Sequence, residues 1–159
     1  MSDTQGIRMS DKYGFDMMDG REVPRLVIAE DHILTGTHQG GVHVEAGEFT
    51  LEGTLQGSLD VQSGVKASIR GRQQGSVAVG EDAVVVVTGA IEGSTHVSRG
   101  GTVIIEASGR LAGSLTNHGE VVVRGVFGGS YDGDGEFRLE GSGYIKEPVV
   151  RDGVSYYEW

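Results

Sequence analysis

The chain has 159 residues, of which 28 are glycine, 2 are proline and none is cysteine, and its 13 Lys and Arg against 23 Asp and Glu give a net charge of −10. This charge argues against nucleic acid or an anionic membrane surface as a ligand, because both require clustered cations, but it permits a basic protein partner. Without cysteine the chain forms no disulfide and no thiolate site.

We expect a cytoplasmic protein with neither a membrane span nor a signal peptide. No run of 18 apolar residues occurs, and residues 1–20 carry acidic side chains without an apolar stretch. Residues 1–21 are polar and predict a flexible N-terminal segment. Residues 22–35 predict an N-terminal cap over the domain that follows, because they contain the apolar residues Val23, Leu26, Val27, Ile28, Ile33 and Leu34.

A five-residue unit with glycine at both ends recurs along residues 36–129 and decides the predicted fold. Its copies are GTHQG (36–40), GTLQG (53–57), GRQQG (71–75), GAIEG (89–93), GRLAG (109–113) and GVFGG (125–129), so their last glycines lie 16 to 20 residues apart. A serine follows every copy but the first, which is followed by Gly41. A fixed period of this length is typical of a solenoid, in which each repeat forms one coil.

Between the glycine units, apolar and polar residues alternate, which indicates half-buried strands. One strand follows each unit, as at Leu59 and Val61. A second precedes the next unit, as at Val85 and Val87, and the middle of the unit adds one inward residue, such as Ile91. Three inward stretches per repeat predict an all-β, three-sided parallel β-helix of about six coils over residues 36–143, with coils about 4.8 Å apart. A helical fold is disfavoured because glycines would interrupt it, and Asn-Gly hairpin turns between the strands are missing.

Residues 144–159 leave the repeat and predict an aromatic C-terminal cap. Residues 131–159 carry 7 acidic and 3 basic side chains, the highest density of acid in the chain. The outer face of this cap is also a candidate contact surface for another subunit or a basic protein. Its candidate partner-binding residues are Tyr144, Asp152, Tyr156, Tyr157, Glu158 and Trp159.

The order of glycine, aliphatic, glycine, small polar residue and alternating aliphatics in GAIEGSTHV (89–97) and GRLAGSLTNHGEVVVRG (109–125) resembles the bactofilins, bacterial polymer-forming cytoskeletal proteins. The resemblance covers about residues 36–141. It implies a right-handed three-sided β-helix, no nucleotide and end-to-end assembly into filaments. A six-residue phasing from Phe49 through Leu55 and Val61 is also similar to the left-handed helix of hexapeptide acyltransferases, but the glycine or acid that follows the aliphatic residue in those enzymes is mostly missing here.

Few side chains offer chemistry. In the predicted register, one outward column contains His43, Asp60 and His96. His43 and Asp60 lie on adjacent coils, where they can form an ion pair, whereas His96 is too far from His43 to share a metal. The segment YDGDGE offers calcium the hard oxygen ligands Asp132, Asp134 and Glu136. An acidic corner loop is the preferred interpretation, because the spacing matches no EF-hand loop.

We expect no catalytic residue, cofactor or metal, because the sequence contains neither a phosphate loop nor a nucleophile elbow beside a plausible base. The expected function is that of a non-enzymatic structural or scaffold protein, which associates with itself through coil ends or faces into a homo-oligomer or filament. One alternative is an acidic immunity or inhibitor-type protein that neutralises a basic partner such as a toxin. A hexapeptide-type acyltransferase is the minor alternative.

Overall fold

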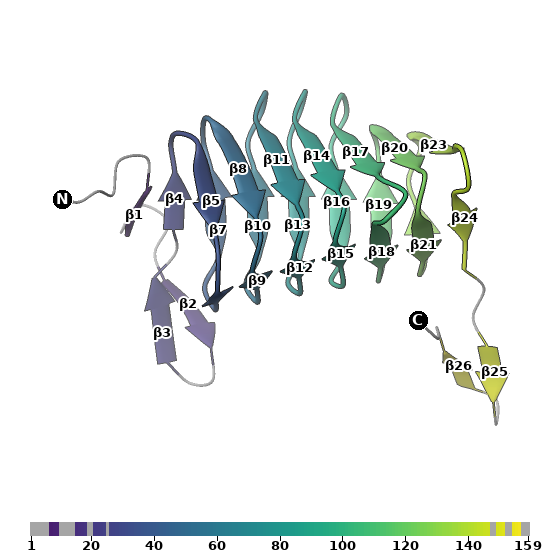
Figure 1. The fold of residues 1–159 in the computed structure, drawn as a ribbon, viewed down its shortest axis with the longest axis horizontal. Helices are drawn as coiled ribbons and strands as arrows, with labels where there is room; N and C mark the ends of the chain where they lie inside the picture. The colour runs from purple at the N-terminus through teal and green to yellow at the C-terminus, as the bar shows by residue number, and fades with distance from the viewer. Residues whose placement is uncertain are drawn as a thin grey trace.

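The computed structural model describes residues 7–9, 15–18, 21–24, 26–146, 149–151 and 154–156, with side chains described in residues 26–146. Most of the strands wrap around one core as an elongated solenoid (Figure 1). Each coil contributes one strand to each of three sheets, and strands of successive coils pair in parallel. The prediction of a three-sided parallel β-helix is therefore confirmed. The described part of the chain contains no helix that could cross a membrane.

Three sheets run along the long axis of the solenoid. The first sheet contains β1 (Ile7–Met9), β4 (Leu26–Ile28), β7 (Val42–Val44), β10 (Leu59–Val61), β13 (Val77–Val79), β16 (Thr95–Val97), β19 (Leu115–Asn117) and β22 (Tyr131–Asp132). The second contains β5 (His32–Leu34), β8 (Glu48–Leu51), β11 (Lys66–Ile69), β14 (Val84–Val87), β17 (Thr102–Ile105), β20 (Glu120–Val123) and β23 (Glu136–Leu139). The third contains β6 (Thr37–His38), β9 (Thr54–Leu55), β12 (Arg72–Gln73), β15 (Ala90–Ile91), β18 (Arg110–Ala112), β21 (Val126–Gly128) and β24 (Tyr144–Ile145).

The solenoid has seven coils, one more than the six expected, because each of the second and third sheets has 7 strands. Coil 1 consists of β4, β5 and β6, which pair in parallel with the strands of coil 2. Residues 26–35 therefore belong to the solenoid, although the sequence predicts a cap there. Their alternation continues in phase with coil 2, since Leu26 pairs with Val42 and Ile28 with Val44. At the other end, β24 places Tyr144 and Ile145 in coil 7 rather than in the predicted C-terminal cap.

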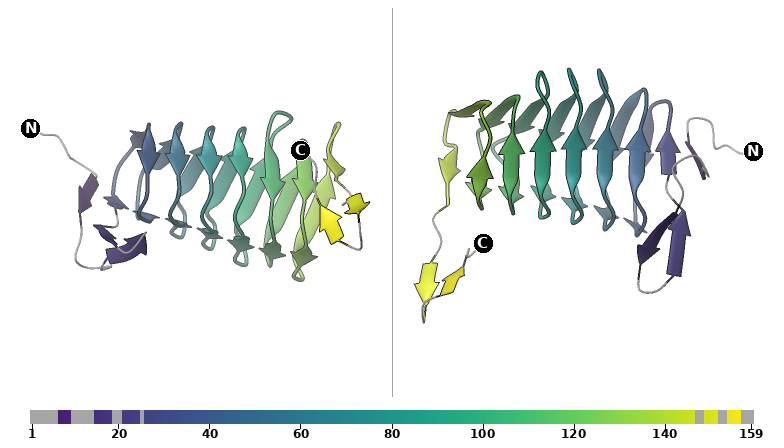
Figure 2. Two further views of the ribbon diagram at one scale, coloured as in Figure 1. Left: turned by 90° about the horizontal axis from the view of Figure 1, so that it is seen from below. Right: turned by 180° about the vertical axis from the view of Figure 1, so that it is seen from behind.

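Glycines at the corners allow the coils to approach closely. The corners align from coil to coil (Figure 2). A Cβ atom on Gly53 would overlap the carbonyl oxygen of Gly36, and one on Gly71 would overlap the carbonyl oxygen of Gly53. Neither Gly53 nor Gly71 has a positive φ. Close contact between backbones, rather than left-handed conformation, therefore explains glycine at these two corners.

The inward columns of the three sheets form one continuous hydrophobic core. Phe49, Val85 and Ile105 are fully buried, as the predicted alternation requires. Two amides, Gln73 and Asn117, are also fully buried in these columns. The Gln73 Nε2 group donates hydrogen bonds to the carbonyl oxygens of three corner residues: Gly57 (3.0 Å), Gly75 (3.2 Å) and Ser76 (3.4 Å). The Gln73 amide thus provides hydrogen-bond donors for backbone carbonyl groups at the corner between the third and first sheets.

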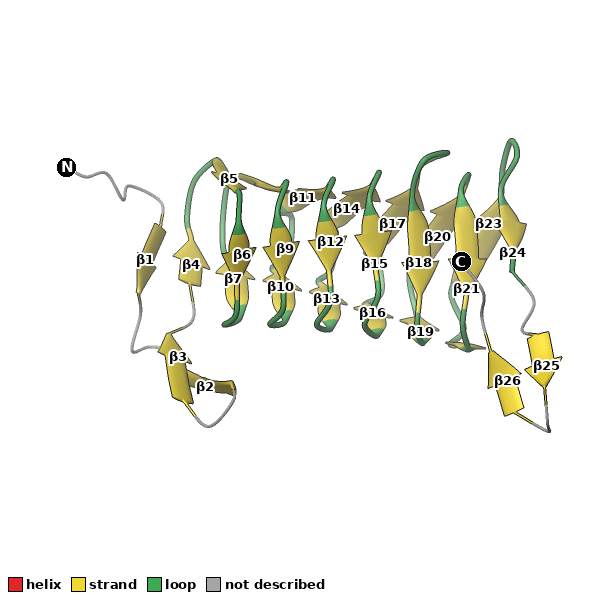
Figure 3. Cartoon of the chain, turned by 60° about the horizontal axis from the view of Figure 1, so that its bottom comes forward, coloured by secondary structure: helices red, strands yellow, loops and turns green. Residues whose placement is uncertain are grey.

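The two ends of the solenoid differ. At the N-terminal end, β1 pairs antiparallel with β4 of coil 1. Two antiparallel hairpins lie beside the ends (Figure 3): β2 (Phe15–Met18) with β3 (Arg21–Pro24), and β25 (Val149–Arg151) with β26 (Val154–Tyr156). Neither hairpin is part of the three solenoid sheets.

Candidate interaction end

The last coil exposes large apolar side chains at the C-terminal end of the solenoid. The exposed fractions are 40% for Tyr131, 48% for Leu139, 50% for Tyr144 and 45% for Ile145. Elsewhere in residues 26–146, Ile33 is the one large hydrophobic side chain that is exposed. We define the C-terminal end face as Tyr131, Phe137, Leu139, Tyr144 and Ile145.

Each strand of coil 7 is the last strand of its sheet. Among the described strands, β22, β23 and β24 each have a neighbour on one side only, so three open edges meet at this end. Phe137 and Leu139 continue the inward column of the second sheet, because they pair with the buried residues Val121 and Val123. Phe137 is only partly buried and Leu139 is about half exposed. The reason is that no described strand pairs with β23 on its outer side.

Three aromatic rings, two of which belong to this face, pack against one another. Phe137 lies 5.5 Å from Phe127 and 5.0 Å from Tyr131 between ring centroids, and Phe127 lies 6.4 Å from Tyr131. The interplanar angles of these pairs lie between 65° and 84°, so the contacts are edge-to-face, which is a favourable arrangement for aromatic pairs. The end face is therefore attached to coil 6 through an aromatic cluster.

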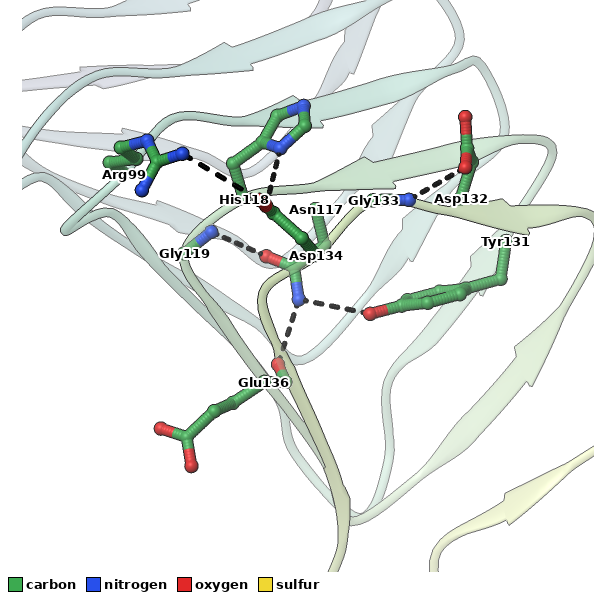
Figure 4. A network of polar contacts seen from close by, with 9 residues as sticks. All are labelled: Arg99, Asn117, His118, Gly119, Tyr131, Asp132, Gly133, Asp134 and Glu136. Atoms are coloured by element: carbon green, nitrogen blue, oxygen red, sulfur yellow. Dashed lines mark hydrogen bonds and ion pairs between the residues drawn. The ribbon is translucent and has the colours of Figure 1, made fainter.

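Asn117 fastens coil 7 to coil 6 from inside the core (Figure 4). Its Nδ2 group donates to the Glu136 carbonyl oxygen at 2.7 Å and to the Tyr131 hydroxyl at 3.3 Å. Its Oδ1 atom accepts the Gly119 N–H at 2.9 Å. Sequence reasoning missed this residue. The available signal was a polar side chain at an inward position that holds valine in the four preceding coils: Val44, Val61, Val79 and Val97.

Asp134 ties the corner of coil 7 to the two preceding coils (Figure 4). Its Oδ1 atom lies 2.8 Å from His118 Nδ1, and its Oδ2 atom lies 3.6 Å from an Arg99 guanidinium nitrogen. The hydrogen bond with His118 lowers the pKa of Asp134 below its ordinary value, and the positive charge of Arg99 acts in the same direction. Sequence reasoning considered Asp134 as a calcium ligand and missed its pairing with His118.

The acidic loop does not assemble a cation site. Figure 4 shows the carboxylates of Asp132, Asp134 and Glu136 pointing in different directions. The Asp132 carboxylate accepts the Gly133 N–H at 2.8 Å. Within the described residues, no group of three His, Asp or Glu side chains is placed to hold a metal ion. Two of these carboxylates therefore contact the protein itself, that of Asp132 within the loop and that of Asp134 on the preceding coils.

Charge pairs between successive coils line the outer face near the C-terminal end. Arg124 of coil 6 pairs with Glu106 of coil 5 at 3.0 Å and with Glu140 of coil 7 at 3.2 Å. Arg138 of coil 7 pairs with Glu120 of coil 6. The flank of the last coils is therefore charged, in contrast to their end.

The remaining candidate residues lie apart from this end or outside the described residues. His43 Nδ1 lies 2.9 Å from an Asp60 carboxylate oxygen, which confirms the predicted pair. His96 follows in the same outward column, as predicted, and its ring centroid is 5.6 Å from that of His118. Tyr156 belongs to β26, where side chains are not described. Four further predicted contact residues lie outside the described residues: Asp152, Tyr157, Glu158 and Trp159.

A candidate interaction surface is thus defined by coil 7 alone, in which three open edges surround exposed apolar side chains. Comparison of the chain with protein-family models, with curated proteins and with solved structures gave no match.

Proposed function

We propose that this protein is a non-enzymatic scaffold that associates with itself through the C-terminal end of its solenoid. The observation that carries the proposal is the coincidence of open edges and exposed apolar side chains on coil 7. An exposed edge strand with apolar side chains is a template for pairing with another chain. Exposed apolar side chains that gather on one surface mark an interaction site.

The flanks of the solenoid are less suited to self-association than its end. They carry paired charges, such as Arg124 with Glu106 and Arg138 with Glu120, whose partners would have to be desolvated. The end face instead offers the same two features by which each coil already holds its neighbour, namely backbone pairing and apolar side chains. A second copy of the chain supplies both features.

The test is a measurement of mass at chain concentrations up to about 100 μM, by sedimentation or light scattering at physiological salt. We expect the unmodified protein to form dimers or larger assemblies. Leu139→Glu and Ile145→Glu should each weaken association at least about tenfold, because each places a charge where an apolar side chain is buried on assembly. Ile33→Glu is the matched control, because Ile33 is 56% exposed but belongs to coil 1, and it should leave association unchanged.

A monomer at the highest concentration would overturn the proposal. Association that survives both coil 7 substitutions, or that is lost equally with Ile33→Glu, would place the contact elsewhere on the molecule. Far-ultraviolet circular dichroism must show the same strand content for all variants, since only then does a change in mass report on association.

A further inference from the structure

The N-terminal end of the solenoid does not present the three open edges of the C-terminal end. There β1 pairs antiparallel with β4 along its full length, with Ile7 opposite Ile28, Arg8 opposite Val27 and Met9 opposite Leu26. The neighbouring edges at this end, those of β5 and β6, have no partner strand among the described residues. At the N-terminal end, one of the three edges is thus closed, because β1 pairs with β4 in the antiparallel direction.

Burial also distinguishes β4 from the later strands of the first sheet. All three residues of β4 are buried, whereas the middle residue of each following strand of the first sheet, from β7 to β19, is partly or fully exposed. Val27 stands in the outward column of His43 and Asp60 and is fully buried, while the side chains of His43 and Asp60 are 13% and 44% exposed. The covered region therefore extends beyond the hydrogen-bonding edge of β4 to its outer face.

We propose that β1 is a terminating strand, which occupies the edge of β4 and thereby limits assembly of the scaffold to closed dimers joined through their C-terminal end faces. This inference rests on the proposed function. Among the described strands and side chains, a C-terminal end that meets a second C-terminal end brings three unpaired edges and the apolar end face into the contact, whereas an N-terminal end brings two unpaired edges and the exposed side chain of Ile33. Two identical ends related by a twofold axis form a closed contact, so growth stops at two chains.

Displacement of β1 would open the second end to a further copy. The occupant of the freed edge would be the N-terminal end of another dimer, because its C-terminal ends are already engaged. The pairing of β1 with β4 demonstrates that this edge accepts an antiparallel strand, which is the direction in which a twofold-related β4 would approach. Assemblies would then grow by alternating C-terminal and N-terminal contacts.

The test uses the full chain with Arg8→Pro and Met9→Pro together. Successive N–H groups of a strand point to opposite sides, so one of these two prolines must remove a donor that faces β4. The matched control carries Asp16→Pro and Met17→Pro in β2, a strand that pairs with β3 and not with the solenoid. Masses are measured by sedimentation, together with negative-stain microscopy.

We expect dimers for the unmodified protein and for the β2 control, and tetramers or longer assemblies for the β1 variant. A synthetic peptide of residues 4–12, added in excess, should return the β1 variant to dimers by refilling the edge. Larger species that the peptide does not reduce, or a β1 variant that stays dimeric, would overturn the inference. An unmodified protein that already forms filaments would overturn the inference and leave the proposed function standing, whereas an unmodified monomer would remove the proposed function itself.

Discussion

At the scale of single residues, the corner glycines set how closely the coils stack. A Cβ on Gly71 would overlap the backbone oxygen of Gly53, and no side-chain rotation can relieve an overlap with backbone. We expect Gly71→Ala to lower the free energy of unfolding by more than about 3 kcal/mol, at the upper end of overpacking effects. Urea denaturation followed by circular dichroism provides the measurement.

Gly64 provides the matched control for this substitution. It has a φ of +75°, and an added Cβ would meet no atom within 4 Å. Gly64→Ala therefore introduces only left-handed backbone strain, which costs about 1–2 kcal/mol. Equal losses for the two alanine variants would contradict close stacking as the reason for glycine at the corners.

At the scale of an element, β14 carries valines on both its inward and its outward face. Val85 is fully buried in the inward column, whereas Val86 faces outward between Ser68 and Ile104 of the neighbouring strands. Val85→Asp should unfold the protein or cost more than about 4 kcal/mol, because it buries an unpaired charge. Val86→Asp should change the free energy of unfolding by less than about 1 kcal/mol. Thermal melts that rank the two variants in the opposite order would show that the register is shifted by one residue.

The same alternation explains how much of the fold could be predicted from the sequence. It placed Val85 inward, because inward and outward residues alternate within a strand. It also put His43 beside Asp60, because each lies three residues after the last glycine of its unit. The same register also places His118 beside Asp134, because each lies five residues after the last glycine of its unit, Gly113 or Gly129, so this pair was predictable although sequence reasoning missed it. The alternation of apolar residues does not predict the buried Asn117, because it is a polar residue at an inward position. The closed edge at β4 depends on antiparallel pairing across the end, which leaves no periodic signal.

At the scale of the whole molecule, stability is distributed along a stack in which each coil contacts its neighbours. In such a stack the terminal coils open first, and their anchors decide when they open. Coil 7 is held by the aromatic cluster around Phe137, by the buried Asn117 and by charge pairs that include Asp134 with His118. Because the end face belongs to this coil, loss of these anchors would also remove the proposed contact surface.

The lowered pKa of Asp134 gives this anchor a defined dependence on pH. A carboxyl group whose pKa is lower in the folded protein than its ordinary value of 3.8 stabilises the folded state above that value, and the stabilisation disappears as the pH falls through the lowered pKa. We therefore expect Asp134→Asn to reduce the hydrogen-exchange protection of residues 131–145 at pH about 5, and the difference from the unmodified protein to vanish at pH about 2. The control is Asp132→Asn, which keeps an oxygen to accept the Gly133 N–H and should leave protection unchanged. Protection of coil 7 that is identical in the unmodified protein and in Asp134→Asn at every pH would show that the pair with His118 does not anchor the coil.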